Sequence, residues 1–157
     1  MRKSVSAQGF HPSSSILGYN KAMNVLFFLT PKNVLSYLTS DMTVRQALEK
    51  FKERGYSMLP VIERETGLYI RSVRANDLLD YIMKYRLSFN ELEEHKLANV
   101  NSLWEIKPVS ADAEVSSLLD VLLNQNYAPV VDSRGIFIGI VTRSAALKAV
   151  KSGEGLK

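Results

Sequence analysis

Apolar residues recur along the chain with the spacing of amphipathic helices, and this pattern occurs twice. Residues 44–51 place their apolar side chains on one helical face, and residues 115–122 repeat that face in the second half of the chain. Thr43 and Gln46 form a capping-box pattern before the first helix, and Gly55 is placed to end it in a left-handed conformation. The pattern therefore predicts two equivalent helices.

Two short extended segments follow each of these helices. Residues 56–62 are apolar and too short for a helix, and the chain returns through 68–73 after a turn. Residues 127–131 and 136–141 repeat this arrangement, and a further helix follows each pair of strands. Each half therefore reads as helix, strand, turn, strand and helix, and it begins with a short extended stretch, at 34–38 and 106–109.

The duplication defines the expected domain organisation. Residues preceding the first unit have no helical or strand period, and a polar helical stretch separates the two copies. We expect a flexible basic leader at 1–22, a first unit at 23–87, a linker helix at 88–103, a second unit at 104–150 and a tail at 151–157.

The two halves carry matching motifs. Leu59-Pro60-Val61-Ile62 is followed by Asp77-Leu78-Leu79 in the first half, and Pro129-Val130-Val131-Asp132 is followed by Gly139-Ile140-Val141-Thr142-Arg143 in the second. This pattern resembles the CBS domain pair, or Bateman module, and residues 24–32 are similar to the start of small stand-alone CBS-pair proteins of Gram-positive bacteria. The resemblance implies an α/β fold of tandem CBS domains, each a three-stranded sheet with two helices, related by pseudo-two-fold symmetry.

Composition and charge narrow the function classes. The chain contains no cysteine and two histidines, which excludes thiolate metal sites and disulfides and disfavours a histidine-centred catalytic site. We expect a reducing compartment, the cytoplasm, with no membrane span. The net charge of +4 comes from the basic residues that precede Asp41, so the body is neutral and we do not expect nucleic acid as a partner. We interpret the acidic run as the solvent-exposed face of a helix; it comprises Glu91, Glu93, Glu94 and His95. The sequence contains no recognisable catalytic motif.

The family resemblance implies a nucleotide cleft between the units. A proline in a strand leaves neighbouring backbone groups free to read an adenine edge, and a hydroxyl with an Asp at a strand-to-helix corner can hold a sugar phosphate. The hydroxyl position of this corner is filled by Arg74 in the first unit and by Thr142 in the second. The Asp position is filled by Asp77 in the first unit and by Ala145 in the second, so neither corner has both groups. Arg71 also stands where the second unit has Gly139. The full set of candidate ligand-binding residues is Ser36, Tyr37, Ser57, Met58, Leu59, Pro60, Arg74, Asn76, Asp77, Lys107, Tyr127, Ala128, Pro129, Thr142 and Arg143.

Each candidate also has a purely structural interpretation. The two prolines can simply bend an edge strand, and Asp77 and Thr142 can be helix caps. Arg64, Arg71, Arg74 and Lys107 can be solvated surface charges. These alternatives stay open at the level of sequence.

We therefore expect a regulatory sensor, not an enzyme, with no required cofactor and with an adenine nucleotide (AMP, ADP, ATP or a cyclic dinucleotide) as its ligand. The alternative is a ligand-free interaction or dimerisation module that has lost nucleotide binding and docks an effector protein. A weaker option uses the basic leader as a tether to nucleic acid or membrane. The family resemblance also implies a homodimer that buries the helical faces bearing Leu78, Leu79, Ile82, Leu118 and Leu122.

Overall fold

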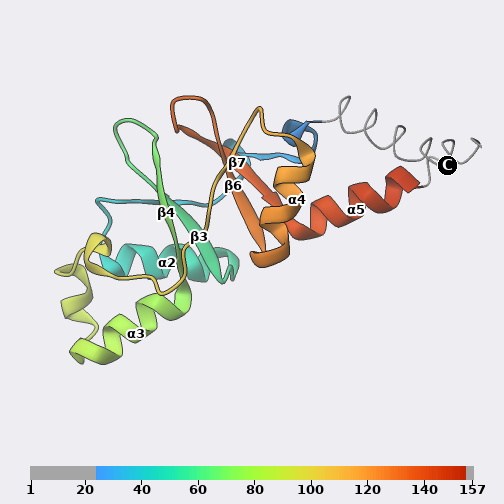
Figure 1. The fold of residues 1–157 in the computed structure, drawn as a ribbon. Coiled ribbons are helices and arrows are strands. Elements are labelled where there is room, and N and C mark those ends of the chain that lie inside the picture. The colour runs from blue at the N-terminus through green and yellow to red at the C-terminus, as the bar shows by residue number, and fades with distance from the viewer. Residues whose placement is uncertain (1–23, 155–157) are drawn as a thin grey trace, which may run out of the picture.

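The computed structural model describes residues 24–154, so the expected leader at 1–22 lies outside the described residues. Two α/β units stand side by side, each with a small sheet and two helices (Figure 1). Within the described part of the chain, no helix is both long and apolar enough to span a bilayer.

The first unit contains the sheet β2-β3-β4. Its strand β2 is parallel to β3, and β4 is antiparallel to β3. Helix α2 lies between β2 and β3 in the chain, and α3 follows β4. The elements are β2 (Leu38–Thr39), α2 (Val44–Arg54), β3 (Met58–Ile62), β4 (Tyr69–Arg74) and α3 (Ala75–Tyr85).

The second unit repeats this order, which confirms the duplication. Pro60 lies opposite Ser72 in the first hairpin, and Pro129 lies opposite Ile140 in the second. In both hairpins the register shifts directly after the next pair, which is Val61–Arg71 in the first and Val130–Gly139 in the second. The two backbones therefore match position by position. The elements are β5 (Val109–Ser110), α4 (Val115–Asn124), β6 (Tyr127–Val131), β7 (Phe137–Thr142) and α5 (Arg143–Glu154).

The second sheet has four strands instead of the expected three. Strand β1 (Thr30–Pro31) pairs antiparallel with β7, and the sheet order is β1-β7-β6-β5. The preceding helix η1 (Val25–Phe28) buries Val25 and Phe28 in the core of the second unit. The start of the segment that was expected to belong to the first unit thus packs on the second, because the apolar side chains of η1 complete that core.

The linker differs from the expected single helix. It contains two short 3-10 helices, η3 (Asn90–Glu93) and η4 (Leu97–Asn99). Two further 3-10 helices, η1 and η2 (Lys32–Val34), precede β2. Helix α5 continues through Glu154, so residues 151–154 of the expected tail are helical.

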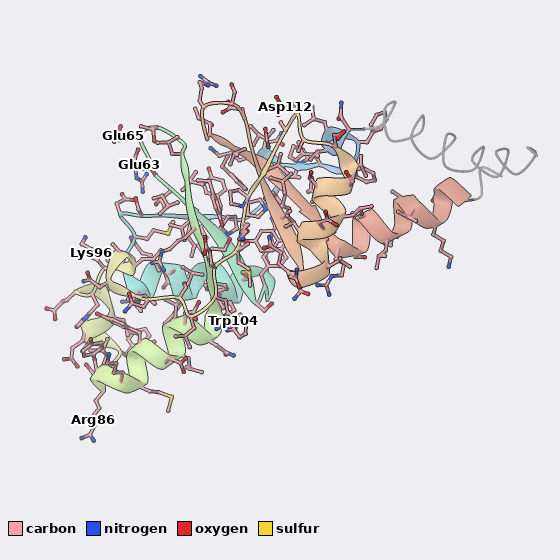
Figure 2. All side chains as sticks on the ribbon, in the orientation of Figure 1. Glu63, Glu65, Arg86, Lys96, Trp104 and Asp112 are labelled. Atoms are coloured by element: carbon pink, nitrogen blue, oxygen red, sulfur yellow. The ribbon has the colours of Figure 1, made fainter. Side chains whose placement is uncertain are left out.

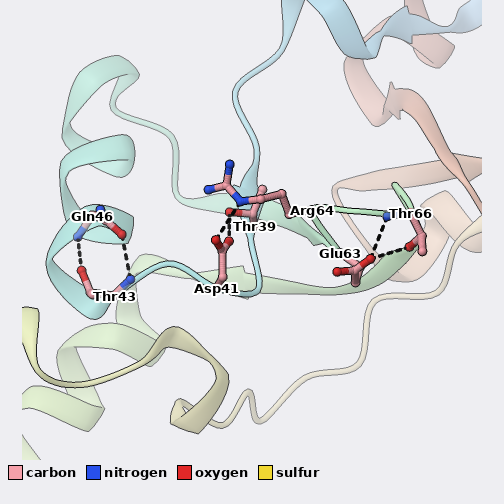
Figure 3. A network of polar contacts seen from close by, with 7 residues as sticks. All are labelled: Thr39, Asp41, Thr43, Gln46, Glu63, Arg64 and Thr66. Atoms are coloured by element: carbon pink, nitrogen blue, oxygen red, sulfur yellow. Dashed lines mark hydrogen bonds and ion pairs between the residues drawn. The ribbon is translucent and has the colours of Figure 1, made fainter.

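The predicted ends of α2 are confirmed. The Thr43 hydroxyl accepts from the Gln46 N–H at 3.2 Å, and Gln46 Oε1 accepts from the Thr43 N–H at 3.0 Å (Figure 3). Gly55 ends the helix with φ of +68°. Next to this cap, Arg64 Nε donates to Asp41 at 2.7 Å, which ties the end of β3 to the start of the α2 turn. Arg64 is exposed, as a surface charge would be.

Each unit has its own core, and this corrects the expected dimer face. Leu78, Leu118 and Leu122 are buried inside their own units, so they are not free to contact a second chain. On the same helices Leu79, at 51% exposure, and Leu123, at 77%, point to solvent. The helical period was correct, but three of the five residues assigned to the dimer face belong to the cores. Of the other two, Leu79 is exposed as expected and Ile82 is partly buried against the first core.

Candidate functional site

The two strand prolines lie in central strands, not in the edge strands that the sequence suggested. Their surroundings are nevertheless partly open. Strand β2 pairs with β3 only at Val61 and Ile62, and β5 pairs with β6 only at Val130 and Val131. Among the described residues, the part of β3 up to Pro60 and the part of β6 up to Pro129 therefore pair with a strand on one side only. Proline has no N–H with which to extend the ladder on the other side.

A cavity of about 380 Å³ lies where the first half of β3 meets the end of β7. Both units contribute to it, β3 from one side and β6, β7 and β1 from the other. It is lined by Thr30, Leu35, Ser36, Tyr56, Ser57, Met58, Leu59, Pro60, Asn126, Tyr127, Ile140 and Thr142. We call it the central cavity. Its volume is within the range of small-molecule sites, and its walls are mostly apolar with a few hydroxyl groups.

Seven of the fifteen expected residues line this cavity, namely Ser36, Ser57, Met58, Leu59, Pro60, Tyr127 and Thr142. Tyr37 borders a separate surface hollow with Lys32 and Arg64. The structure thus brings the expected residues of both units together in one cavity, at the corner where β7 ends with Thr142.

Thr142 marks the corner between β7 and α5. Its Oγ1 accepts a hydrogen bond from the Ala145 N–H at 3.0 Å, so the hydroxyl caps the helix as the structural interpretation proposed. A hydroxyl has one donor and two acceptor sites, so this bond leaves the O–H free to donate to an oxygen in the cavity. The two interpretations of Thr142 are therefore compatible.

A basic hollow of about 490 Å³ adjoins the central cavity. It shares Asn126 and Thr142 with the cavity and continues along α5 past Lys148 and Lys151. Arg143 also lines it, but Arg143 Nε donates to the Leu122 carbonyl at 2.8 Å and its Nη2 donates to the Gln125 carbonyl at 3.1 Å. The Arg143 guanidinium thus satisfies the carbonyl end of α4, and the two lysines are the cations left to meet an anion.

The equivalent corner of the first unit is closed by its own side chains. The Asp77 carboxylate accepts from the Arg74 N–H at 2.8 Å and from Arg74 Nη2 at 3.2 Å, and its side chain is 1% exposed. The Arg74 guanidinium lies 5.6 Å from the ring centre of Trp104, which stands on the segment joining the units beside this corner (Figure 2). Asp77 therefore caps α3, and both of its oxygens are engaged within the chain.

A buried hydroxyl cluster joins the two sheets. Ser72 Oγ is hydrogen-bonded to the Tyr127 hydroxyl and, at 2.9 Å, to the Tyr69 hydroxyl, which also donates to the Ile106 carbonyl. Burial raises the pKa of Tyr69 to about 12 and also raises the pKa of Tyr127, and in both cases the bond to Ser72 opposes the shift. Both phenols stay neutral at ordinary pH and hold the units together.

Among residues 24–154, no group of three or more His, Asp or Glu side chains is placed so that it could hold a metal ion. His95 instead packs against Tyr81, whose hydroxyl lies 2.8 Å from His95 Nδ1.

Comparison with protein families gives a match to the CBS domain over two segments, residues 29–84 and 104–152. Those segments are the two units described above. The chain belongs to the CBS domain family. A comparison with curated protein sequences found no match.

Solved structures of CBS proteins share this tandem arrangement. CbpB in complex with c-di-AMP has a TM-score of 0.76 and 21% identity, and the match covers 88% of this chain and 93% of that chain. A CBS domain protein from Streptococcus pneumoniae TIGR4 has a TM-score of 0.74 and 26% identity over 96% and 97% of the two chains. CBSX2 in complex with AMP has a TM-score of 0.66 and 26% identity over 85% and 99%.

The remaining expected residues of this CBS pair lie away from the central cavity. Arg74 and Asp77 form the ion pair of the first corner, and Asn76 is exposed beside them. The backbone of Lys107 is held by the Gln125 side chain, with bonds of 3.0 and 2.9 Å, and Lys107 itself is exposed. Ala128 and Pro129 are buried in β6, and their role as ligand contacts stays a prediction.

Sequence reasoning missed several residues that line the CBS central cavity. Asn126 is equivalent by register to Ser57, so the duplication itself could have indicated it, whereas Tyr56 directly precedes Ser57 in the chain. Thr30 and Ile140 meet through the β1–β7 pairing, which no local pattern announces. Lys148 and Lys151 are three apart on α5, a spacing that places them on one helical face.

Proposed function

We propose that this CBS pair is a regulatory sensor that binds an adenine nucleotide in the central cavity. The observation that carries the proposal is that a mostly apolar cavity of about 380 Å³ adjoins, at Asn126 and Thr142, a basic hollow lined by Lys148 and Lys151. A flat purine fits between apolar walls, and a phosphate group is stabilised by lysine ammonium groups. The complexes of CbpB with c-di-AMP and of CBSX2 with AMP support this ligand class.

The purine is placed against Met58, Leu59 and Tyr127, and Ser57 and the Thr142 hydroxyl supply polar contacts. The phosphate is placed toward the start of α5, where the Thr142 O–H is available as a donor. The Arg143 and Ala145 N–H groups already donate to the Asn126 carbonyl and to Thr142 Oγ1. Neither hollow is lined by a carboxylate. No carboxylate among the lining residues therefore repels the anionic part of the ligand.

A regulatory role is supported by the fact that both units contribute residues to the walls of the central cavity. A ligand shifts the angle between two units only by as much as it binds one arrangement better than the other. Because the cavity is built from β3 on one side and β7 on the other, a bound nucleotide contacts both, and its binding favours one relative placement. We assign the chain a regulatory role in the cytoplasm, with no catalytic step of its own.

Calorimetric titration of the purified full chain with AMP, ADP, ATP and c-di-AMP tests this function. We expect at least one of them to bind with a dissociation constant below 1 mM. Thr142→Val keeps the shape but removes the hydroxyl, so it is expected to weaken binding about tenfold, the scale of one hydrogen bond to a charged group. Lys148→Gln with Lys151→Gln removes the cations, and Lys52→Gln, on the exposed face of α2, is the matched control. Absence of binding by all four nucleotides would overturn the proposal.

The second candidate, a ligand-free interaction module, is favoured by one observation. The first corner satisfies Asp77 entirely with Arg74, as expected of a unit that has no ligand of its own. If no nucleotide binds, this candidate replaces the sensor. In either case we propose a homodimer, whose contacts would come from the exposed faces of α3 and α4.

A further inference from the structure

A second basic hollow lies on the first unit and has a volume of about 630 Å³. Three cations line it, and they come from three different elements: Lys32 from η2, Lys50 from α2 and Arg64 from the turn after β3. None of the described residues that line it is acidic. We call it the first-unit hollow, and Leu35 is the one lining residue that it shares with the central cavity.

The two lysines of this hollow have no counter-ion among residues 24–154. Lys32 and Lys50 are half-buried, and neither takes part in an ion pair found in that part of the chain. The Lys32 ammonium lies 5.1 Å from the ring centre of Tyr37, which also lines the hollow. A ring face attracts a cation but does not neutralise it, so both ammonium charges are available to an anion.

Arg64 is engaged through one of its nitrogens. Its Nε donates to Asp41 Oδ2 at 2.7 Å, and Asp41 also accepts from the Thr39 hydroxyl at 2.6 Å (Figure 3). Within the described residues, Nη1 and Nη2 of Arg64 form no hydrogen bond, so their N–H groups can donate to a second carboxylate. Three cations beside one carboxylate leave this surface with an excess of positive charge.

The second unit shows that the fold does not require these cations. Lys50 is the seventh residue of α2, and the seventh residue of α4 is Val121, which packs against the second core. Arg64 is the second residue after β3, and the second residue after β6 is Ser133. The two halves share their backbone, so these cations are a property of the first unit alone and core packing does not account for them.

Carboxylates limit the space for an anion on one side. An adjoining hollow, which is also lined by Lys50, has Glu49 and Glu53 among its lining residues. Like charges repel, so an anion is disfavoured on that side of the helix. The favourable space is therefore the first-unit hollow itself, on the side of Lys32 and Tyr37.

We propose that the first-unit hollow is a docking site for an acidic peptide segment of a partner protein. Carboxylates of the segment pair with Lys32, Lys50 and the Nη atoms of Arg64, since a carboxylate accepts charge-assisted hydrogen bonds from both kinds of cation. Leu35 and Met42 provide apolar contact for a nonpolar side chain between the acids. A phosphate ion is much smaller than a hollow of this volume, whereas a peptide extends across it. The proposal does not depend on nucleotide binding.

Fluorescence anisotropy of a labelled peptide tests the site on the full chain. The probe is a short capped peptide of glutamate and serine with one central leucine, and the comparison peptide has lysine in place of every glutamate. We expect the acidic peptide to bind with a dissociation constant below about 1 mM at low salt, and to bind about tenfold more weakly at high salt because ions screen the charges. Equal binding of the lysine peptide would overturn the proposal.

Variants locate the binding on the hollow. Lys32→Gln with Lys50→Gln removes both ammonium groups and is expected to weaken peptide binding about tenfold, and Arg64→Gln is expected to weaken it about threefold. Lys52→Gln, on the exposed face of α2, and Arg134→Gln, in the corresponding turn of the second unit, are the matched controls and should leave the affinity unchanged. Equal losses in variants and controls would show attraction to the net charge only and would overturn the proposal.

Folding and the central cavity are controlled separately. Circular dichroism checks that each variant folds, and Lys32→Gln alone, outside the α-helices, replaces the double variant if the latter does not fold. Thr142→Val should leave peptide binding unchanged, since Thr142 lines the central cavity. A loss of peptide binding in Thr142→Val equal to that in Lys32→Gln would place the peptide in the wrong site and overturn the assignment, whatever nucleotides bind.

Two competitors identify the class of anion. Inorganic phosphate and a short single-stranded RNA are added to the complex of the chain with the labelled peptide. We expect the unlabelled acidic peptide to displace the probe at a concentration at least about tenfold lower than either competitor. Displacement by phosphate at the same concentration as the peptide would make the hollow a small-anion site, and displacement by less RNA than peptide would make it a nucleic-acid site. Either result would overturn the proposal.

Discussion

The hydroxyl groups of Ser72 and Tyr127 are hydrogen-bonded to each other across the boundary between the two sheets. Ser72 lies in the middle of β4 and Tyr127 begins β6, so the bond joins the units where both are buried. It also lies beside the central cavity, which Tyr127 lines. A polar contact at this place sets the relation of the units more specifically than apolar packing, because its geometry is directional.

Tyr127→Phe removes this bond without removing the ring. We expect the free energy of unfolding to fall by about 1 kcal/mol, because Ser72 keeps the Tyr69 hydroxyl as a partner and only one hydrogen bond is lost. Urea unfolding followed by circular dichroism measures the change. Tyr85→Phe, at a half-exposed position on α3, is the matched control and should change the free energy by less than about 0.5 kcal/mol. Equal effects of the two substitutions would contradict a role for the inter-sheet bond.

Alkaline pH should weaken the fold through Tyr69. The pKa of Tyr69 rises from 10.0 to about 12 because burial disfavours the phenolate. A raised pKa means that the unfolded chain loses its proton first, so this stabilisation is complete below pH 10 and is lost between pH 10 and 12. The loss amounts to about 2 kcal/mol. Urea midpoints measured across this range should fall less steeply for Tyr69→Phe than for the unaltered chain, and parallel curves would contradict the prediction.

Gly139→Ala should detach the N-terminal strand. A Cβ atom at this position overlaps the Thr30 carbonyl oxygen, so β1 has to move away from β7. We expect a loss of about 2 kcal/mol in the free energy of unfolding, the scale of overpacking in a tight site. Amide exchange of Ile140, opposite Thr30, should quicken with it. Gly55→Ala is the control, because a Cβ there meets nothing within 4 Å and only the left-handed φ of +68° carries a cost. Unchanged exchange at Ile140 would show that β1 tolerates the methyl group.

Asp77→Asn separates stability from ligand binding. Asp77 is buried and paired with Arg74, so the loss of its charge should destabilise the fold by about 3 kcal/mol. Because the carboxylate does not line the central cavity, the dissociation constant of a nucleotide bound there should stay within twofold. Thermal unfolding and calorimetry on the same sample measure both. A tenfold weaker affinity in the folded variant would instead place the nucleotide at the first corner.

The proposed homodimer is tested on the solvent face of the helices. Leu123 on α4 is 77% exposed and Leu79 on α3 is 51% exposed, so charges there do not disturb the cores. We expect Leu79→Asp with Leu123→Asp to convert a dimer to a monomer in light scattering. Val34→Asp, at an exposed apolar residue outside both helices, should leave the dimer intact. A molecular mass that is monomeric before any substitution would remove the homodimer.

The sequence by itself determined the repeated unit. Helical periodicity, the Thr43 cap, the left-handed Gly55 and the paired prolines are local features, each set by interactions within a few residues, and two copies of the same local pattern fold alike. It also pointed to most of one cavity wall, because Ser57 to Pro60 and Thr142 sit at fixed places in that repeat.

Only the tertiary structure decided which corner is open and which surfaces meet. Whether Leu78 or Leu79 enters the core depends on side-chain packing between elements distant in the chain. The pairing of Asp77 with Arg74 is a local contact three residues apart, and the sequence had already offered it as the helix-cap alternative. The placement of Thr30 on the second sheet, and the space left beside Arg71, depend in the same way on whether a Cβ atom is present at one equivalent position of β7 and β4. Such contacts are long-range and steric, so no period or motif in the sequence encodes them.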